Sequence, residues 1–323
     1  MRMTLERRFT PPKLEAGPAA EKAGFPTSSI PFPHLLRPLD DIIIIINPAA
    51  RSERARHTWE KIGTLSRAKI QPTTAPGDAC RLAREAAAEG RRIVVAAGGD
   101  GTINEVVNGL AGSKTALGVL PVGTMNVFAT ELGLPNDLEE AWEIIEAGYT
   151  RAIDLGQVND KYFVQLAGVG IDAQVVERTS SEFKKNFGPL SYVINAAQIA
   201  AQKPPRLIVE SDGVTREGSF VLVGNGRYYG MPLKVFKDAR LDDGLLDVIV
   251  AQNTSHLDLI RYFTGVVTGT HTDFQDIAYF HARELKVTSP DDVPIEVDGE
   301  LAGKLPANFR IAPHGLNVVV DYS

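Results

Sequence analysis

A glycine turn between an apolar run and a helical pattern is the segment best suited to chemistry. Gly98-Gly99-Asp100-Gly101 follows the apolar run 93–97 and precedes the helical pattern 102–110. Because glycine lacks a Cβ, N–H groups in such a turn can approach a phosphate closely, and a helix start adds partial positive charge. Thr102 and Glu105 have the spacing of a capping box. The turn predicts an anion site, although it could also serve tight packing alone.

Two further segments at strand ends complement this turn. Asn47-Pro48-Ala49-Ala50-Arg51 follows the apolar run 42–46 and offers an amide and a guanidinium to a phosphate. Residues 121–126 form a second glycine-containing turn, with a hydroxyl donor at Thr124. Each segment could instead be a plain terminator of a strand or a capped turn. Neighbouring strand ends of a parallel sheet nevertheless share one crevice, which favours ligand binding.

Two acidic segments could supply metal ligands and a base. Asp242-Asp243-Gly244 precedes a strand pattern, and Asp298-Gly299-Glu300 lies between two. Asp-Gly is a strong turn signal, so both could be hairpin turns only. Carboxylates and carbonyls also hold Mg²⁺, and an acid can deprotonate an attacking hydroxyl in phosphoryl transfer. The histidines are scattered and no serine lies in a Gly-x-Ser-x-Gly elbow, so a zinc site and a hydrolase triad have no support.

Composition narrows the class of protein. The net charge of the 323 residues is −6, which gives no strong global field to attract nucleic acid or anionic lipid, although local basic patches remain possible. The single Cys80 excludes an internal disulfide and suits a reducing compartment. The longest purely apolar run, 42–46, is far shorter than the roughly 18 residues of a membrane span. Residues 1–40 are rich in proline and are predicted to be a disordered leader.

The elements that must position these segments alternate up to about residue 150. Apolar strand patterns lie at 42–46, 69–73, 93–97 and 116–120, and helical patterns at 55–65, 77–90, 102–110, 127–132 and 138–147. This alternation predicts an α/β N-terminal nucleotide-binding domain, with a doubly wound parallel sheet, over residues 41–150.

A β-rich, sandwich-like C-terminal domain is predicted over residues 151–323. Strand patterns lie at 154–158, 162–167, 206–210, 219–223, 245–251, 285–288 and 318–321, and helical patterns at 190–202 and 257–267. Turn signals separate the strands. Whether the final strand returns to the first domain is open.

Seven motifs occur in a fixed order. They are Asn47-Pro48, Thr73 before Gly77-Asp78-Ala79, 98–105, 121–126, 168–172, 241–247 and 297–300. Together they resemble the diacylglycerol-kinase-like lipid kinases, which include soluble bacterial diacylglycerol kinases and sphingosine and ceramide kinases. The resemblance spans residues 41–321 and implies an α/β nucleotide domain followed by a β-sandwich.

The resemblance also implies roles for individual residues. The residues implied to contact ATP are Asn47, Pro48, Ala49, Ala50, Arg51, Thr73, Gly98, Gly99, Asp100, Gly101, Thr102, Ile103, Asn104 and Thr124. Asp243 is implied to hold Mg²⁺ together with backbone carbonyls near Arg240 and Leu245. Glu300 or Asp298 is implied to be the base toward the lipid hydroxyl, and the choice between them is open. Bare carboxylate and phosphate repel, so we expect Asp100 to act through metal or water.

The chain departs from the family pattern in two places. Val127 stands where the family often has an acidic residue, so one carboxylate of the usual network is missing. Residues 225–237 replace a segment that is usually rich in glycine, which leaves the identity of the substrate open. Residues 228–237 and 180–187 combine apolar and basic side chains, as either an interfacial contact or a buried hairpin would.

We therefore expect an ATP- and Mg²⁺-dependent lipid kinase that transfers the γ-phosphate to a lipid hydroxyl, with diacylglycerol as acceptor and phosphatidic acid as product. The enzyme would be cytoplasmic, in peripheral contact with the inner face of a membrane, and a homodimer is left open. An NAD kinase shares the glycine turn and the two-domain plan. A catalytically silent nucleotide- or lipid-binding protein is a further alternative, supported only by Val127.

Overall fold

The computed structural model describes residues 41–48, 61–64, 68–170, 173, 204–230 and 233–322. All of them belong to one unit, Pro38–Ser323. The predicted helix 190–202, the segment 180–187 and Ala49, Ala50 and Arg51 lie outside the described residues, as does most of the predicted helix 55–65. Residues 61–64 of that helix are helical.

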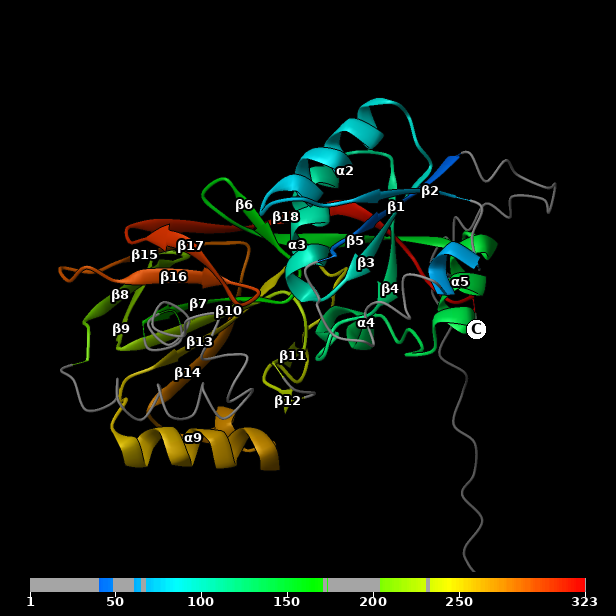
Figure 1. Ribbon diagram of the computed structural model, residues 1–323. Coiled ribbons are helices and arrows are strands. Elements are labelled where there is room, and N and C mark those ends of the chain that lie inside the picture. Colours follow the sequence, from blue (N-terminus) through cyan, green and yellow to red (C-terminus); the bar gives the residue numbers. More distant parts are fainter. Residues whose placement is uncertain are drawn as a thin grey trace, which may run out of the picture. The chain divides into compact units, whose positions relative to one another are not determined.

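A parallel sheet forms the N-terminal part. Its strands are β1 (Ile42–Ile46), β2 (Lys69–Pro72), β3 (Ile93–Gly98) and β4 (Ala116–Pro121), in the order β2-β1-β3-β4. Every residue of β1 is buried, because its five isoleucines pack alternately into cores on the two faces of the sheet. The helices α2 (Asp78–Ala88) and α3 (Asp100–Leu110) cover one face, and α5 (Leu138–Ala147) covers the other (Figure 1). The doubly wound arrangement is confirmed.

The same sheet continues into the C-terminal part through the last strand. β18 (Ala307–Val319) runs parallel to β4, with Asn317 opposite Ala116, and antiparallel to β5 (Thr150–Val158). The remaining strands of this ten-stranded sheet are β6 (Lys161–Phe163), β8 (Leu207–Ser211), β9 (Val214–Gly218) and β15 (Glu284–Thr288). The final strand thus returns to the first part of the chain, and the boundary predicted at 150/151 falls at the start of β5.

A second, antiparallel sheet packs on this extension and completes a sandwich. Its order is β14 (Ile277–Ala282), β13 (Leu246–Ala251), β10 (Phe220–Gly224), β7 (Leu166–Gly170), β16 (Pro294–Val297) and β17 (Glu300–Lys304). Inward side chains of both sheets form one apolar core. The predicted β-rich, sandwich-like part is confirmed.

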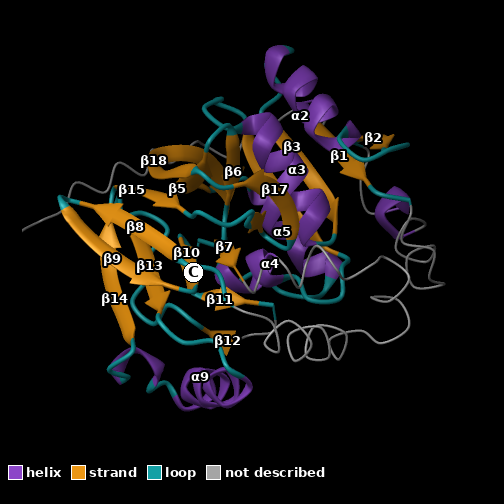
Figure 2. Ribbon diagram, turned by 90° about the vertical axis from the view of Figure 1, so that its left-hand side faces the viewer, coloured by secondary structure: helices purple, strands orange, loops and turns teal. Residues whose placement is uncertain are grey.

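Smaller elements lie outside the sandwich. They are the short hairpin of β11 (Tyr228–Tyr229) and β12 (Leu233–Lys234), the helix α9 (His256–Thr268), the 3₁₀ helix η2 (His271–Asp273) and the helix α4 (Val127–Glu131). Figure 2 shows α9 beside β12 and β14. None of the described helices is long and apolar enough to cross a membrane.

Two local predictions were wrong. The helix α3 begins at Asp100 with Gly99 as N-cap, so Thr102 and Glu105 form no capping box. Glu105 instead accepts a hydrogen bond from the N–H of Ala79, at 3.0 Å, and thereby satisfies the start of α2. The strand predicted at 162–167 is two strands, β6 and β7. It breaks where the N–H groups of Val164 and Gln165 turn toward the carboxylate of Asp298.

Candidate active site

The turn between β3 and α3 packs backbone to backbone against a second turn. A Cβ on Gly123, in the second turn, would lie 2.6 Å from Cα of Gly99. A Cβ on Gly98 would lie 2.5 Å from Cβ of Thr102. Both positions therefore favour glycine. A side chain on Gly123 would push the two turns apart, and one on Gly98 would collide with the side chain of Thr102. The first N–H groups of a helix have no partner within it, so the start of α3 carries partial positive charge.

A cavity of about 640 Å³ lies against the start of α3. Four stretches of chain line it, and the residues are Asn47, Pro48, Thr73, Thr74, Ala75, Pro76, Ala79, Gly99, Gly101, Thr102, Glu105 and Glu300. Asn47 Nδ2 donates to Oγ1 of Thr102 at 3.3 Å, which fixes the end of β1 on the first turn of α3. The volume is typical of a small-molecule site, and the helix start favours an anion within it.

Glu300 brings a carboxylate from the C-terminal part to this cavity. It is the first residue of β17, and a Cβ on Gly101 would lie 2.8 Å from its Oε1. The carboxylate therefore lies directly against the backbone of the glycine turn. A carboxylate at this position could take the proton of a hydroxyl that attacks a phosphate bound at the turn.

Asp298, two residues earlier, has different surroundings. Its Oδ1 accepts from the N–H groups of Gln165 and Leu166 at 3.0 and 3.1 Å. Its Oδ2 accepts from the N–H of Val164 at 2.9 Å and from Nδ2 of Asn104 at 2.6 Å. Burial raises the pKa of Asp298, and these donors oppose the rise. The residue joins α3 to the β6–β7 loop and to the turn that carries Glu300.

The turn itself is the hairpin that the Asp-Gly signal predicts. Asp298 and Gly299 have φ angles of 47° and 85°, and the two residues connect β16 to β17. The segment can therefore be a hairpin turn and also supply a base. The tight turn is what directs Glu300 toward Gly101.

Asp100, the first residue of α3, directs its carboxylate to the start of α4. Its Oδ1 accepts from the N–H of Phe128 at 3.4 Å. Burial raises the pKa of Asp100, and the N–H groups at the start of α4 oppose the rise. Val127 is the first residue of α4, so the side chain that the family often has here would lie next to Asp100. Val127 contributes no carboxylate beside Asp100.

The predicted metal residues lie in the turn before β13. Asp243 is exposed, and its Oδ1 accepts from the N–H of Leu245 at 3.0 Å. The N–H of Gly244 donates to Oδ2 of the buried Asp154 at 2.7 Å, which holds the turn in place. One carboxylate with backbone carbonyls is a set of hard oxygen donors, so these residues fit Mg²⁺. Among the described residues, no three His, Cys, Asp or Glu side chains cluster as metal ligands.

Comparison with known proteins assigns the family. Residues 41–158 match the diacylglycerol kinase catalytic domain, and residues 165–320 match the YegS C-terminal NAD kinase beta sandwich-like domain. A diacylglycerol kinase of Staphylococcus aureus (strain bovine RF122 / ET3-1) is 36% identical over 276 residues, which cover 82% of this chain and 88% of that protein. This chain belongs to the diacylglycerol kinase family. A second relative, the diacylglycerol kinase of S. aureus strain JH9, is 38% identical over 238 residues, or 72% and 76% of the two chains.

Solved structures share the fold of this family member. A crystal structure from Bacillus anthracis strain Sterne superposes with a TM-score of 0.75 at 23% identity, covering 90% of this chain and 99% of that one. Another, described as a diacylglycerol kinase from the same strain, has a TM-score of 0.71 and covers 87% and 97%. As a member of the family, the chain is a lipid kinase, a phosphotransferase that acts on an alcohol group. The assignment favours this activity over the NAD kinase alternative.

The cavity gathers only part of the predicted site of this diacylglycerol kinase family member. Asn47, Pro48, Thr73, Gly99, Gly101, Thr102 and Glu300 line it. Of the predicted residues that the structure describes, Gly98, Asp100, Ile103, Asn104, Thr124, Asp298, Arg240, Asp243 and Leu245 are not among its lining residues. Among these, Ile103 is fully buried in the core beneath α3, and Thr124 is exposed.

Residues 74–76 and the carboxylate of Glu105 also line the cavity, and their place there was not predicted from the sequence. The available signal was Asp78, whose Oδ2 accepts from the N–H groups of Thr74 and Ala75 at 2.8 and 3.1 Å. Asp78 lies six residues after the end of β2, and its carboxylate closes the loop between β2 and α2. The loop thereby becomes one wall of the cavity.

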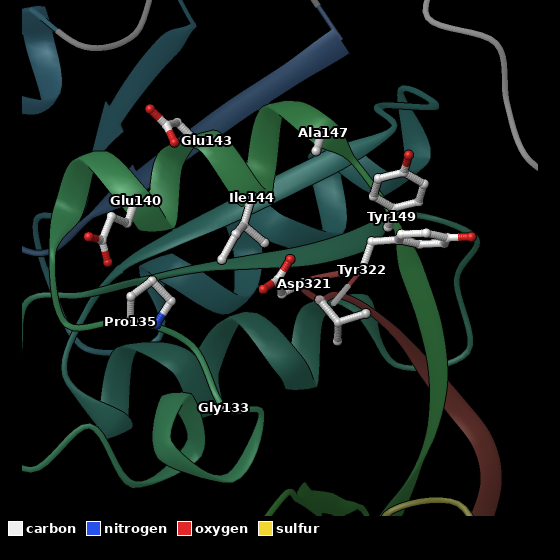
Figure 3. A pocket seen from close by; sticks show the side chains of 10 residues that line it. Gly133, Pro135, Glu140, Glu143, Ile144, Ala147, Tyr149, Asp321 and Tyr322 are labelled. Atoms are coloured by element: carbon white, nitrogen blue, oxygen red, sulfur yellow. The ribbon is translucent and has the colours of Figure 1, made fainter.

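A second cavity, of about 500 Å³, lies between α5 and the end of the chain (Figure 3). Tyr149 and Tyr322 form one wall, with ring centroids 4.5 Å apart, and Glu140, Glu143 and Asp321 contribute carboxylates. It contains none of the predicted site residues. Three carboxylates would repel a polyphosphate, so this cavity is not the nucleotide site.

Proposed function

We propose that the chain transfers the γ-phosphate of ATP to the free hydroxyl of diacylglycerol, giving phosphatidic acid and ADP, with Mg²⁺ required. The single observation that carries the proposal is the position of Glu300 against Gly101, in one cavity with Asn47 and Thr73. A phosphate-binding turn and a base from another part of the fold meet there. The names of the S. aureus relatives support diacylglycerol as the acceptor.

The reaction follows from the chemistry of the cavity. The acceptor hydroxyl attacks the γ-phosphorus, its oxygen forms the new P–O bond, and the bond to the β–γ bridging oxygen breaks. Glu300 takes the hydroxyl proton, and ADP leaves with the bridging oxygen. N–H groups at the start of α3 stabilise the negative charge of the phosphates throughout. Asp298 holds the turn of Glu300 in place and does not touch the reacting atoms.

Mg²⁺ would lower the repulsion between the phosphates and the carboxylates around the cavity. Asp243 and the carbonyls of Arg240 and Leu245 are the proposed ligands of a supporting ion. Because Val127 contributes no charge beside Asp100, we propose that Asp100 is the one carboxylate that acts through metal or water near the phosphates.

We further propose that the acceptor is met at the cytoplasmic, inner face of a membrane, where ATP is available, and that nucleic acid is not a partner. The net charge of −6 supports the second point. The proposed reaction could be carried out by a monomer or by a homodimer.

Transfer from γ-labelled ATP to a panel of acceptors in mixed micelles tests the proposal. The panel is diacylglycerol, monoacylglycerol, sphingosine and ceramide, with soluble NAD as a separate arm. We expect labelled phosphatidic acid, and no product when EDTA removes Mg²⁺. Product on NAD alone would instead identify an NAD kinase. ATP binding with no product on any acceptor would identify a silent binding protein.

A further inference from the structure

The helix α9 carries an apolar stripe on its outer face. Leu257, Ile260, Phe263 and Val267 lie at helical spacing and are 79%, 64%, 58% and 59% exposed. The opposite face is also apolar in part, because Gly265 packs against the ring of Phe274 and the neighbouring Tyr262 and Val266 face the protein. A helix with apolar residues on both faces is ordinarily covered on both. The outer stripe of α9 is therefore a candidate binding surface.

The helix is held firmly in this orientation. Ser255 and Asp258 form a capping box at its start. Asp276, in the loop before β14, accepts from Arg261 and, at 2.6 Å, from the hydroxyl of Tyr262. These bonds lie on the inner and lateral sides of the helix. The apolar stripe is thus presented outward by a fixed element rather than by a loop.

A chain of contacts connects α9 with the glycine turn. His271, directly after α9, is buried and hydrogen-bonds the carbonyl of Val235 through Nε2 at 2.7 Å. The N–H of Val235 donates to the carbonyl of Arg227 at 2.9 Å. Arg227 pairs with the buried Glu131 of α4 at 2.8 Å, and the start of α4 lies on Asp100. The outer helix and the candidate active site are therefore parts of one connected framework.

Two basic side chains lie next to α9. Lys234 is exposed on β12, which contacts α9. Cε of Lys237 is 3.9 Å from where a Cβ on Gly269, the C-cap of α9, would stand. The carboxylates of Asp258, on α9, and of Asp276, in the loop before β14, are paired with Arg261. An apolar helix face edged by lysines is the pattern of an interfacial helix that lies in the headgroup region of a bilayer.

We propose that α9 docks the chain on a lipid bilayer, with Leu257, Ile260, Phe263 and Val267 inserted at the acyl boundary and Lys234 and Lys237 against anionic headgroups. The inference rests on the proposed function, because a kinase of diacylglycerol must reach an acceptor that is dissolved in a membrane. This surface lies outside the segments 228–237 and 180–187 except for the two lysines. The bilayer is favoured over a second copy of the chain because it explains the lysines together with the link to the catalytic framework.

Flotation of the full chain with vesicles tests the docking without any need for turnover. The vesicles contain phosphatidylcholine, phosphatidylglycerol and diacylglycerol, and the test variant is Leu257→Glu with Phe263→Glu. Val214→Glu is the matched control, since Val214 is also apolar and 48% exposed, but lies on the β8–β9 hairpin. We expect the double variant to bind vesicles at least about tenfold more weakly than the parent, and the control to bind like the parent.

Two further readouts keep the outcomes distinct. Activity on a short-chain diacylglycerol below its aggregation concentration should be unchanged in the double variant, while activity on vesicles falls. Parent and variant must show the same circular dichroism, and Phe263→Trp should add blue-shifted emission with vesicles.

Equal vesicle binding by parent and double variant overturns the inference. So does a parent dimer that the double variant converts to monomers, because a second copy would then cover the stripe. If no lipid is phosphorylated at all, the proposed function fails, but the flotation result still decides the docking.

Discussion

Asp298 and Glu300 are two carboxylates only two residues apart, but they have different surroundings. These surroundings, and not the residue type, distinguish a structural role from a catalytic one. The two carboxylate oxygens of Asp298 accept hydrogen bonds from four N–H donors, whereas the side chain of Glu300 lines the cavity. The sequence predicts that this turn matters, but spacing could not choose between the two side chains. The choice depends on the N–H groups of residues 164–166, which are more than a hundred residues away along the chain.

Asp298→Asn should therefore lower stability and reduce activity only in part. An asparagine offers one acceptor oxygen and brings an NH₂ group against N–H donors. We expect the free energy of unfolding to fall by about 1–3 kcal/mol and kcat by roughly tenfold, with the KM for ATP little changed. Thermal unfolding and steady-state kinetics measure both. A loss of all activity with unchanged stability would mean that Asp298 itself acts on the substrate.

Restoring the missing acid tests the role of Asp100. Val127→Asp places a second carboxylate at the start of α4, next to Asp100. We expect the variant to need less Mg²⁺ for half-maximal activity, by a few fold, since two carboxylates bind the ion more strongly than one. The same two charges repel when metal is absent, so EDTA should lower the melting temperature of the variant more than that of the parent. An unchanged Mg²⁺ requirement would argue against metal at Asp100.

At the scale of elements, the two glycine-containing turns depend on each other. The sequence predicts both turns and the strands before them, because buried parallel strands are continuous apolar runs that end at glycine and proline. It could not predict that Gly123 contacts the backbone of Gly99, since contact between two loops depends on the packing of the whole sheet. The capping box predicted for Thr102 and Glu105 was wrong for the same reason, because it too depends on contacts between distant segments. Glu105 satisfies the start of another helix, and local spacing cannot reveal a partner across the fold.

Gly123→Ala should damage nucleotide binding. Its Cβ would lie 2.6 Å from Cα of Gly99, and backbone cannot move aside as a side chain can. We expect ATP to bind at least about tenfold more weakly and the protein to lose about 1–3 kcal/mol of stability. Gly63→Ala is the control, because it meets nothing within 4 Å and lies in a helical segment. Calorimetric titration with ATP measures the difference, and normal binding by Gly123→Ala would contradict the packing.

The attachment of α9 should depend on pH. Hydrogen bonds from Arg261, and then from Tyr262 and Asn253, lower the pKa of Asp276. An acid whose folded pKa is depressed contributes stability above its unfolded value of about 4 and loses it as the pH falls below that value. The parent should therefore lose stability below about pH 4 more steeply than Asp276→Asn does. Urea unfolding at pH 3 and pH 6 measures both, and equal pH dependence would contradict the ion pair.

For the whole molecule, the continuous sheet makes the two predicted domains mutually dependent. β18 contributes to both, since it pairs with β4 of the α/β part and with β15 of the sandwich. The sequence predicts the fold class of each part because alternating and β-rich patterns are local. It left the place of the last strand open, because apolar residues in a strand do not reveal which neighbours it pairs with.

Val318→Asp should destabilise both parts at once. Val318 is fully buried where β18 lies between β4 and β5, so the variant places an unpaired charge in the core. We expect a loss of at least about 3 kcal/mol and, in parent and variant alike, one cooperative calorimetric transition. Separate transitions for the two parts would contradict a single connected sheet.

The variant Glu300→Gln, measured under single-turnover conditions, is the sharpest test of whether Glu300 is the base. The variant keeps the size and shape of the side chain but cannot take the proton of the acceptor hydroxyl. With ATP binding measured in parallel, we expect a fall of about 10²–10⁴-fold in the rate of phosphate transfer to diacylglycerol and an unchanged affinity for ATP. A transfer rate equal to that of the parent, with ATP bound normally, would contradict the assignment of Glu300 as the base.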